Sequence, residues 1–597
     1  MNFARKLLRA LGPEGGRGLA LLTVLVTMAS LLEVAGMGAV MQFMGWIESP
    51  GRLSSPAFAP VRHFLGLEQQ RELLITLGLS VVVLLAFGKA FNAFALWSQH
   101  RYVWQQDKLM STRLLVSFLS RPYDWFLRQN GAHLNRYLNS REFSSNLLAG
   151  VTDMISATLV TLILLTSLFW VDPWVALITM LGVALAQTCL LLVTRNPIRR
   201  WSDEAHELLH RRAVVGQEAM AGIKPLLSFA RESCYVDEFV RLSERGSQLQ
   251  AWREMVWDIP RFFLEAVALG LLLCLTLYFV IWGGITRLLP MLSLYAMAGY
   301  RVIPAVHLLF HSLTRIRSSL PALDAYLEFI EESPGRDLSP PSERLRMTQS
   351  LRLERLVFRY SDEGAPALQQ LDLEIRPKEL IGIVGSTGSG KTTLTDILMG
   401  LLSPSAGCFS VDGQVLDSES QRHWRGSVGY VPQNVFLSDD TVSRNIAFAV
   451  PPAKADQQAV IRAAEAAHIG GVIESLPLGY DTPVGDNGVR LSGGQRQRIG
   501  IARALYADPD LLIFDEATSS LDSVTEDAVM QAIGALSSSK TIVLVAHRLQ
   551  TVKNCDRIYV LEAGRVAATG TYDELLKTSP AFQALARSAP AVAALEG

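Results

Sequence analysis

Six long apolar stretches in the first half of the chain constrain its fold more than any other feature. Each is long enough to cross the hydrocarbon core of a bilayer as a helix. They cover residues 19–47, 73–97, 152–170, 174–194, 262–283 and 288–312. The whole chain is 49% hydrophobic and has a mean hydropathy of +0.24, which is typical of a protein with a large membrane part.

The segments between the apolar stretches indicate how the helices are connected. The third and fourth stretches are separated only by "VDP", and the last two by "GGITR", so each pair predicts a helical hairpin. The long polar segments 98–151 and 195–258 are rich in Arg and Lys and predict helical extensions into the cytoplasm. The basic N-terminus "MNFARKLLRALGPEGGRG" precedes a first membrane helix; a cleavable signal peptide is the alternative.

The second half of the chain has a different character. The 597 residues of the whole chain are too many for one core, and a Pro/Ser-rich connector at 333–347 follows the last apolar stretch. Beyond it, short apolar strands alternate with helical patterns, which predicts a soluble α/β domain. We therefore expect a membrane domain at 1–332, a linker at 333–347 and a nucleotide-binding domain at 348–597.

Charge and cysteine usage exclude several classes of function. The formal net charge is −1, which gives no indication of a nucleic-acid partner. The five cysteines lie far apart without a C-x-x-C pair, so neither a disulfide framework nor a zinc site is expected.

The stretch "IGIVGSTGSGKTTLTDILMGLL" combines an apolar strand, a glycine-rich loop and a helix. Residues 385–392 match G-x-x-x-x-G-K-[ST], in which backbone N–H groups and a helix N-terminus surround phosphate oxygens. Lys391 is expected to reach the β- and γ-phosphates of ATP, and the Thr392 hydroxyl to bind Mg²⁺. The predicted nucleotide-binding residues here are Gly385, Ser386, Thr387, Gly388, Ser389, Gly390, Lys391, Thr392 and Thr393.

A second motif, the acidic stretch "LLIFDEATSSLD", completes the ATPase pattern that the phosphate loop begins. Four apolar residues predict a buried strand that places Asp515 at its carboxyl end, where the carboxylate can hold Mg²⁺ through water. Glu516 follows directly and is the predicted residue that polarises the attacking water. Two acids after an apolar strand could by themselves be a surface turn; the phosphate loop favours the ATPase interpretation.

Residues 491–495, in "VRLSGGQRQRIGIARAL", resemble the signature of ATP-binding-cassette (ABC) ATPases. This resemblance covers the soluble half. It implies that Tyr360 stacks on adenine, that Gln433 senses Mg²⁺ and the membrane domain, that Asp522 acts across a dimer and that His547 contacts the γ-phosphate. In the family the signature caps the nucleotide held by the opposite subunit, which would involve Ser492, Gly493, Gly494 and Gln495.

A six-helix membrane half followed by one cassette resembles the exporter class of ABC half-transporters. The single chain carries one phosphate loop and one signature, so a homodimer with two equivalent sites is expected. The resemblance also implies coupling helices in the cytoplasmic segments, which we place near 134–144 and 224–232.

Ionisable residues inside the apolar stretches are costly in a bilayer and therefore informative. They are Glu33, Lys89, Arg261, Glu265 and Arg301. Glu265 could simply pair with Arg261 one turn away, and Glu33 could neutralise one of the cations. Cations on three separate helices nevertheless favour a polar cavity for an anionic group, and Arg suits a diphosphate. Lys89, Arg261 and Arg301 are the predicted substrate residues.

The stretches "LLEVAGMGAVMQF", "IPRFFLEAVAL" and "YRVIPAVH" resemble bacterial ABC flippases of lipid-linked oligosaccharides, typified by the flippase of N-linked protein glycosylation. Segment 54–70 is similar to that family's short external helix, which is thought to contact the polyprenyl tail. The resemblance implies an ATP-driven flippase that moves a polyprenyl-pyrophosphate-linked oligosaccharide across the bacterial inner membrane, with its cassette in the cytoplasm.

Other functions remain open from the sequence. An ABC exporter of another lipid, a peptide or a drug would use the same ATPase with a different cargo. A nucleotide-gated regulatory membrane protein is a further alternative, although proteins of that kind often lose Glu516 or the signature. A soluble ABC protein without transport does not fit the six apolar stretches.

Overall fold

The computed structural model describes residues 3–48, 70–129, 141–171, 211–278, 288–332, 338–341, 343–361, 364–516, 523–546 and 548–593, with isolated positions in between. The chain divides into two compact units. The first combines Met1–Leu119 with Leu134–Gly335, and the second combines Ser120–His133 with Arg336–Gly597. The division after Gly335 falls inside the predicted linker.

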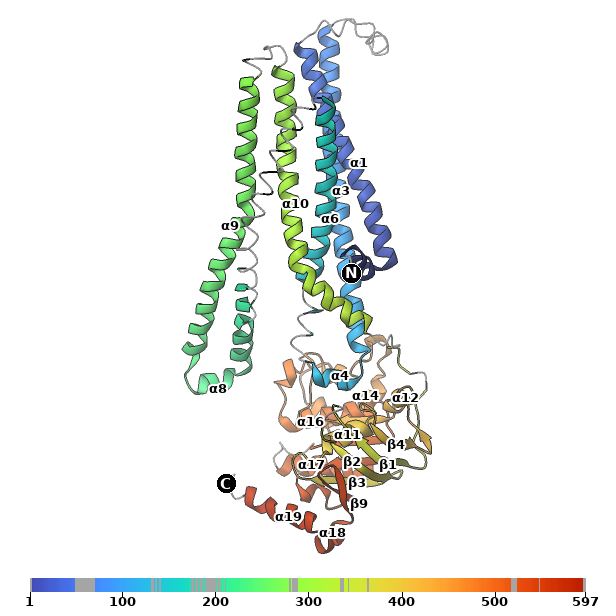
Figure 1. Cartoon of the computed structure of the whole chain (residues 1–597). Coiled ribbons are helices and arrows are strands. Elements are labelled where there is room, and N and C mark those ends of the chain that lie inside the picture. Colours follow the sequence, from blue (N-terminus) through green and yellow to red (C-terminus); the bar gives the residue numbers. More distant parts are fainter. Residues whose placement is uncertain are drawn as a thin grey trace. The chain divides into compact units, whose positions relative to one another are not determined.

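The first unit is built mainly from long helices, most of which are longer than a bilayer is thick (Figure 1). Its described elements are α1 (Phe3–Glu48), α3 (Gln70–Leu119), α6 (Arg141–Val171), α8 (Ile223–Ser228), α9 (Glu232–Tyr278) and α10 (Leu288–Glu331). Helices α1, α3, α6 and α10 contact one another, and α9 contacts α10.

Three helices among the described residues are long and apolar enough to cross a membrane: Phe3–Ile47, Arg71–Leu119 and Asn146–Ile163. They contain the first two predicted spans and the beginning of the third, all of which lies within α6. The fifth and sixth predicted spans begin in α9 and α10, respectively, whereas most of the fourth, 174–194, lies outside the described residues. The count of six remains a prediction.

Glycines permit close packing between these helices. A Cβ at Gly78 of α3 would lie 3.0 Å from the Phe43 ring of α1, and one at Gly150 of α6 would lie 3.2 Å from the Ile316 side chain of α10. Small residues at helix contacts are a common device in membrane bundles, because they let backbones approach.

A polar cluster joins three of the helices near one end of the predicted spans. Gln99 of α3 donates hydrogen bonds to Thr152 and Asp153 of α6. Arg315 of α10 forms an ion pair with Asp153 at 3.3 Å and donates to Asn146 at 3.4 Å. Each polar group therefore has a partner, which is what makes such groups tolerable in a packed bundle.

Two short helices interrupt the long ones. Helix α8 (Ile223–Ser228) overlaps the second predicted coupling segment, 224–232. The other short helix, α4 (Tyr123–Arg128), precedes the first predicted segment, 134–144, and belongs to the second unit.

The second unit contains two sheets and a set of covering helices (Figure 1). Its strands are β1 (Leu351–Phe358), β2 (Leu368–Ile375), β3 (Leu380–Gly385), β4 (Ala406–Val411), β5 (Gln414–Val415), β6 (Val428–Val431), β7 (Leu511–Asp515), β8 (Thr541–Val545), β9 (Arg557–Glu562) and β10 (Arg565–Gly570). Its helices, besides α4, are α11 (Lys391–Leu398), α12 (Ser420–Arg425), α13 (Val442–Ile446), α14 (Gln457–Ala466), α15 (Gly470–Glu474), α16 (Gly493–Tyr506), α17 (Ser523–Ser537), α18 (Tyr572–Thr578) and α19 (Pro580–Ala593).

The six-stranded sheet has the order β10-β9-β3-β8-β7-β6, and all neighbours from β9 to β6 are parallel. The smaller sheet, β2-β1-β4-β5, is antiparallel. Consecutive residues of a central strand enter different cores: Leu511 and Ile513 pack toward the small sheet, and Leu512 and Phe514 toward the opposite helices. A parallel sheet buried on both faces explains the continuous apolar runs in the sequence.

Candidate nucleotide-binding and hydrolysis site

The carboxyl ends of parallel strands share one edge of the large sheet, and the predicted ATPase motifs follow them directly. Strand β3 ends at Gly385, β7 ends at Asp515, and β6 ends two residues before Gln433. Ligands of open parallel sheets bind outside this edge, so the topology assembles motifs that are more than 100 residues apart in sequence.

Glycines in the phosphate loop are required by its geometry. A Cβ at Gly385 would lie 2.4 Å from the Leu561 carbonyl oxygen. Gly390 has φ +99°, and a Cβ there would lie 2.9 Å from the Ala367 carbonyl oxygen. Gly388 has φ +80°, and the space where its Cβ would stand is open. The loop can therefore approach a ligand with bare backbone.

Lys391 begins α11 and turns back over the loop. Its ammonium group donates to the carbonyl oxygens of Gly385 and Ser386, both at 2.9 Å. Burial lowers the pKa of Lys391, while the carboxylates of Glu516 and Asp515 act in the opposite direction. The cation is thus held at the centre of the loop, facing the acidic motif.

The phosphate loop contains hydroxyl groups that are available to bind a triphosphate and Mg²⁺. The Ser389 hydroxyl is buried and has no hydrogen-bond partner among the described residues. Ser386, Thr387 and Thr392 are exposed at the N-terminus of α11. Phosphate oxygens would satisfy these groups, with Thr392 and Asp515 holding the ion. Mg²⁺ bound there supplies charge neutralisation for phosphate oxygens.

Glu516 adopts a conformation that is unusual for a non-glycine residue, with φ +51°. Its backbone N–H donates to Val545 of β8 at 2.9 Å, and its carboxylate accepts a hydrogen bond from the Gln433 side-chain amide at 2.9 Å. Backbone strain of this kind is common at functional sites. The carboxylate is therefore fixed by two neighbouring strands, as a group that polarises water needs to be.

Two residues of this site were not predicted from sequence. The Tyr430 hydroxyl donates to the Asp515 carboxylate at 3.3 Å, and burial next to that carboxylate raises the pKa of Tyr430. Asp396 of α11 is 8% exposed, and burial together with Asp515 raises its pKa to about 6. Tyr430 could have been identified from its place in "GYVPQN", three residues before Gln433. Nothing in the sequence distinguishes Asp396.

Tyr360, the predicted adenine-stacking residue, is held at both ends. Its hydroxyl shares a hydrogen bond with the Thr393 hydroxyl at 2.9 Å, and its ring meets Phe358 edge-on with centroids 5.0 Å apart. Arg128 of α4 donates to its carbonyl oxygen at 2.9 Å. The residue as a whole remains 42% exposed, which leaves room for a base.

The predicted signature residues form the start of α16. Ser492 and Gln495 make a reciprocal capping box, and Ser492 and Gly493 are exposed. Further along this helix, Gln497 donates to the Pro432 carbonyl oxygen at 3.4 Å, and a Cβ at Gly500 would lie 2.8 Å from the Val435 side chain. Helix α16 therefore packs directly on the segment that carries Gln433.

The structure brings together most, but not all, of the predicted site residues. The phosphate loop, Thr393, Tyr360, Gln433, Asp515 and Glu516 lie in one region of the second unit. Asp522 and His547 lie outside the described residues, as do 54–69 of the predicted external helix.

Of the predicted substrate residues, the structure describes one side chain. Lys89 of α3 forms an ion pair with Glu33 of α1 at 2.9 Å, and Asn92 donates to the same carboxylate at 3.5 Å. Glu33 is therefore paired, which is the alternative that the sequence left open. The side chains of Arg261 and Arg301 lie outside the described residues.

Comparison with known proteins agrees with this site. The ABC transporter family profile matches residues 368–519, from β2 past the acidic motif. A protein of Cupriavidus pinatubonensis named ATP-dependent lipid A-core flippase is 32% identical over 499 residues, which is 80% of this chain and 83% of the relative. The chain belongs to the ABC transporter family. A relative of the same name from Burkholderia pseudomallei is 30% identical and covers 85% of each chain.

A solved structure, that of a bacterial Atm1-family ABC exporter with ATP bound, matches with a TM-score of 0.75. The match covers 98% of this chain and 99% of that one at 23% identity. The predicted fold class is confirmed: an exporter-type half-transporter with a helical membrane domain and an α/β ABC ATPase domain. As an ABC transporter, the protein binds ATP with Mg²⁺ and couples ATP hydrolysis to transport.

Proposed function

We propose that this ABC transporter is a flippase that moves a phosphate-bearing glycolipid from the cytoplasmic to the external leaflet of the bacterial inner membrane. The observation that carries the proposal is the extent of the match to the lipid A-core flippases. An alignment of 499 residues is longer than region 348–597, so it extends well into the membrane helices, where cargo is selected.

The finer proposal is that the cargo is a polyprenyl-pyrophosphate-linked oligosaccharide. It rests on the resemblance of the membrane stretches and on the cations Lys89, Arg261 and Arg301, because guanidinium groups suit diphosphate oxygens. Lys89 is neutralised by Glu33, so in this proposal the two arginines supply most of the attraction. A lipid A-core cargo is the second candidate, favoured by the names of the relatives. Both cargoes carry sugars and phosphate.

The roles proposed for the ATPase residues follow their positions. Glu516 polarises the attacking water, Gln433 orients Glu516 and senses the ion, and His547 contacts the γ-phosphate. Lys391 neutralises the phosphates, and Thr392 and Asp515 hold the Mg²⁺. Each role uses a group that the site already directs to the same sheet edge, except His547, which lies outside the described residues.

In this proposal the functional transporter is a homodimer. Ser492 and Gly493 are exposed at the N-terminus of α16, and in this proposal they bind, together with the neighbouring Gly494 and Gln495, the nucleotide held by the second copy. Asp522 would act across the same interface. Light scattering of the purified protein should give the mass of two chains plus bound detergent.

The test of cargo is translocation in proteoliposomes that contain either a fluorescent polyprenyl-pyrophosphate oligosaccharide or a fluorescent lipid A-core. We expect ATP-dependent flipping of the first, lost in Glu516→Gln and reduced in Arg261→Ala and Arg301→Ala. Flipping of lipid A-core alone would move the assignment to the second candidate.

Hydrolysis without flipping of either lipid would refute the glycolipid proposal and favour an exporter of another lipid, a peptide or a drug. A wild-type protein that binds ATP but does not hydrolyse it would instead favour a nucleotide-gated regulatory membrane protein. The two results are distinguishable, because the first keeps a working ATPase.

A further inference from the structure

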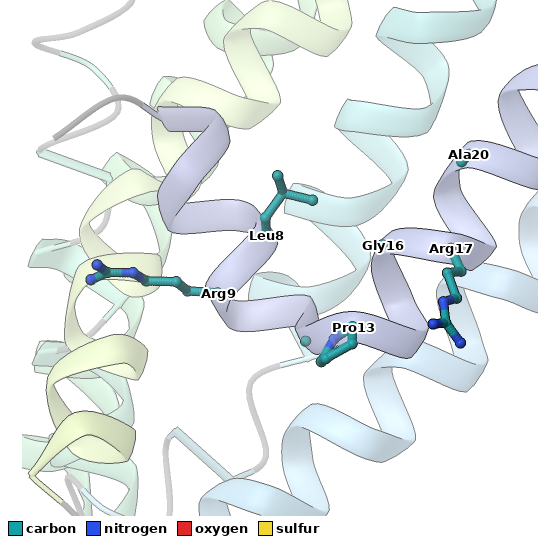
Figure 2. A pocket seen from close by; sticks show the side chains of 7 residues that line it. Leu8, Arg9, Pro13, Gly16, Arg17 and Ala20 are labelled. Carbon is teal, nitrogen blue, oxygen red and sulfur yellow. The ribbon is translucent and has the colours of Figure 1, made fainter.

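A groove opens on the outer side of a kink near the start of α1. Its volume is about 660 Å³, and seven residues of this one helix line it (Figure 2): Leu8, Arg9, Gly12, Pro13, Gly16, Arg17 and Ala20. The kink has a clear cause, because Gly12 has φ +72° and Pro13 cannot donate a backbone hydrogen bond.

The kink is braced by α3. Arg113 donates to the carbonyl oxygens of Ala10 and Leu11 at 3.3 and 3.4 Å, and the Tyr102 hydroxyl donates to that of Gly15 at 2.8 Å. These donors satisfy backbone acceptors around the kink. The groove is therefore a built feature of the helix and not a frayed end.

The two arginines that line the groove differ in their contacts. Arg9 forms an ion pair with Glu331 of α10 at 3.2 Å. Arg17 is exposed, and no ion pair or hydrogen bond of its side chain is found among the described residues. The two arginines extend in different directions in Figure 2, so Arg17 supplies the available cation. Glu14, one turn before Arg17, does not line the groove.

An exposed apolar stripe continues from Arg17 along α1. Leu21, Val24, Met28 and Leu31 are each at least half exposed, and their spacing of three or four residues places them on the helix face that carries Arg17. They lie within the predicted first span, 19–47. A cation followed along one face by apolar side chains complements a phosphate head with an attached hydrocarbon chain.

We propose that this groove binds one anionic phospholipid of the surrounding bilayer. The Arg17 guanidinium holds the lipid phosphate with its forked donors, and one acyl chain follows Leu21, Val24 and Met28. Leu8, Pro13 and Ala20 form the apolar wall beside the glycerol. The site is separate from the transported cargo and does not depend on its identity.

The experiment uses the full chain in detergent, with phosphatidylglycerol as the probe and native mass spectrometry as the readout of bound lipid. We expect retention of phosphatidylglycerol in preference to phosphatidylcholine. Arg17→Gln should weaken it about fivefold, the effect of one basic side chain on an anionic lipid. Arg5→Gln removes the same charge from an exposed position of the same helix outside the groove and should leave retention unchanged.

A second variant tests the groove itself. Ala20→Trp fills the apolar wall without changing the charge and should also reduce retention. Equal losses in Arg5→Gln and Arg17→Gln, or full retention in both groove variants, would refute the site. Basal ATPase activity and the melting temperature identify a variant that has not folded, and the two groove variants change exposed side chains only.

Discussion

The side-chain amide of Gln433 donates a hydrogen bond to the Glu516 carboxylate at 2.9 Å, across the ends of strands β6 and β7. From the sequence, Glu516 is predicted to polarise the attacking water and Gln433 to sense Mg²⁺ and the membrane domain, and the contact holds the carboxylate in place. The position of Glu516 in the left-handed region adds a second constraint on its orientation.

Glu516→Gln should abolish hydrolysis while preserving ATP binding. An amide at that position still accepts the hydrogen bond from Gln433, so the site keeps its shape, but it no longer draws a proton from water. Loss of a positioned base typically costs about 10²–10⁴-fold. Phosphate release and binding of a fluorescent ATP analogue measure the two quantities. Glu562→Gln, an exposed acid at the end of β9, serves as the control with normal hydrolysis.

Tyr430→Phe should raise the Mg²⁺ concentration needed for half-maximal hydrolysis. The change removes the hydroxyl that donates to Asp515, so the carboxylate loses one of the groups that orient it. A hydrogen bond to a charged group contributes about 1.5–3 kcal/mol, although the 3.3 Å distance favours the lower end, about tenfold. An unchanged Mg²⁺ dependence would show that Tyr430 only fills space.

Tyr360→Ala should weaken ATP binding, because it removes the ring proposed to stack on adenine. Stacking of a base on an aromatic side chain contributes about 1–3 kcal/mol. Tyr360→Phe keeps the ring and loses only the hydrogen bond to Thr393, so it should bind ATP within a few-fold of wild type. Titration with a fluorescent ATP analogue measures both, and equal losses in the two variants would contradict stacking.

Asp396→Asn should make the protein more stable at neutral pH. The pKa of Asp396 is raised from 3.8 to about 6, so the folded state favours the protonated form. Wild-type stability therefore falls as the pH rises from about 4 to about 6 and stays lower above it. The variant avoids this loss of folding stability, which amounts to about 1–3 kcal/mol.

Melting temperatures between pH 4 and pH 8 test the sign of this effect, with the two proteins converging at the acidic end. Asp417→Asn is the comparison of opposite sign. Hydrogen bonds from Ser420 lower the pKa of Asp417, so its ionised form is the favoured one, and its variant should lose stability near neutral pH. An Asp396→Asn protein that is less stable at pH 8 would contradict the burial argument.

Local motifs made the ATPase half predictable from sequence. The phosphate loop and the acidic motif each follow an apolar strand, so the position of Lys391 and Glu516 at one sheet edge follows from the parallel topology. The glycines at 385 and 390 are likewise required by contacts that a Cβ would violate.

Contacts between distant segments were not predictable in the same way. Arg128 donates a hydrogen bond to the Tyr360 carbonyl oxygen, 232 residues away in sequence. No pattern in either segment predicts this contact. Asp396 lies on a helix face whose burial depends on the complete sheet. Lys89 and Glu33 were each identified as costly in a membrane, but their pairing depends on how α1 and α3 pack.

Helix α16 links two events that are usually considered separately. Its first residues are the exposed ones proposed to meet the nucleotide of a second copy, and its middle presses on the segment of Gln433 through Gly500 and Gln497. A Cβ at Gly500 would lie 2.8 Å from the Val435 side chain, so helix α16 has little room to slide along the segment of Gln433. If ligand binding shifts Gln433, we expect helix α16 to shift with it, so that in the proposed homodimer the occupancy of one subunit would alter the surface that it offers to the other.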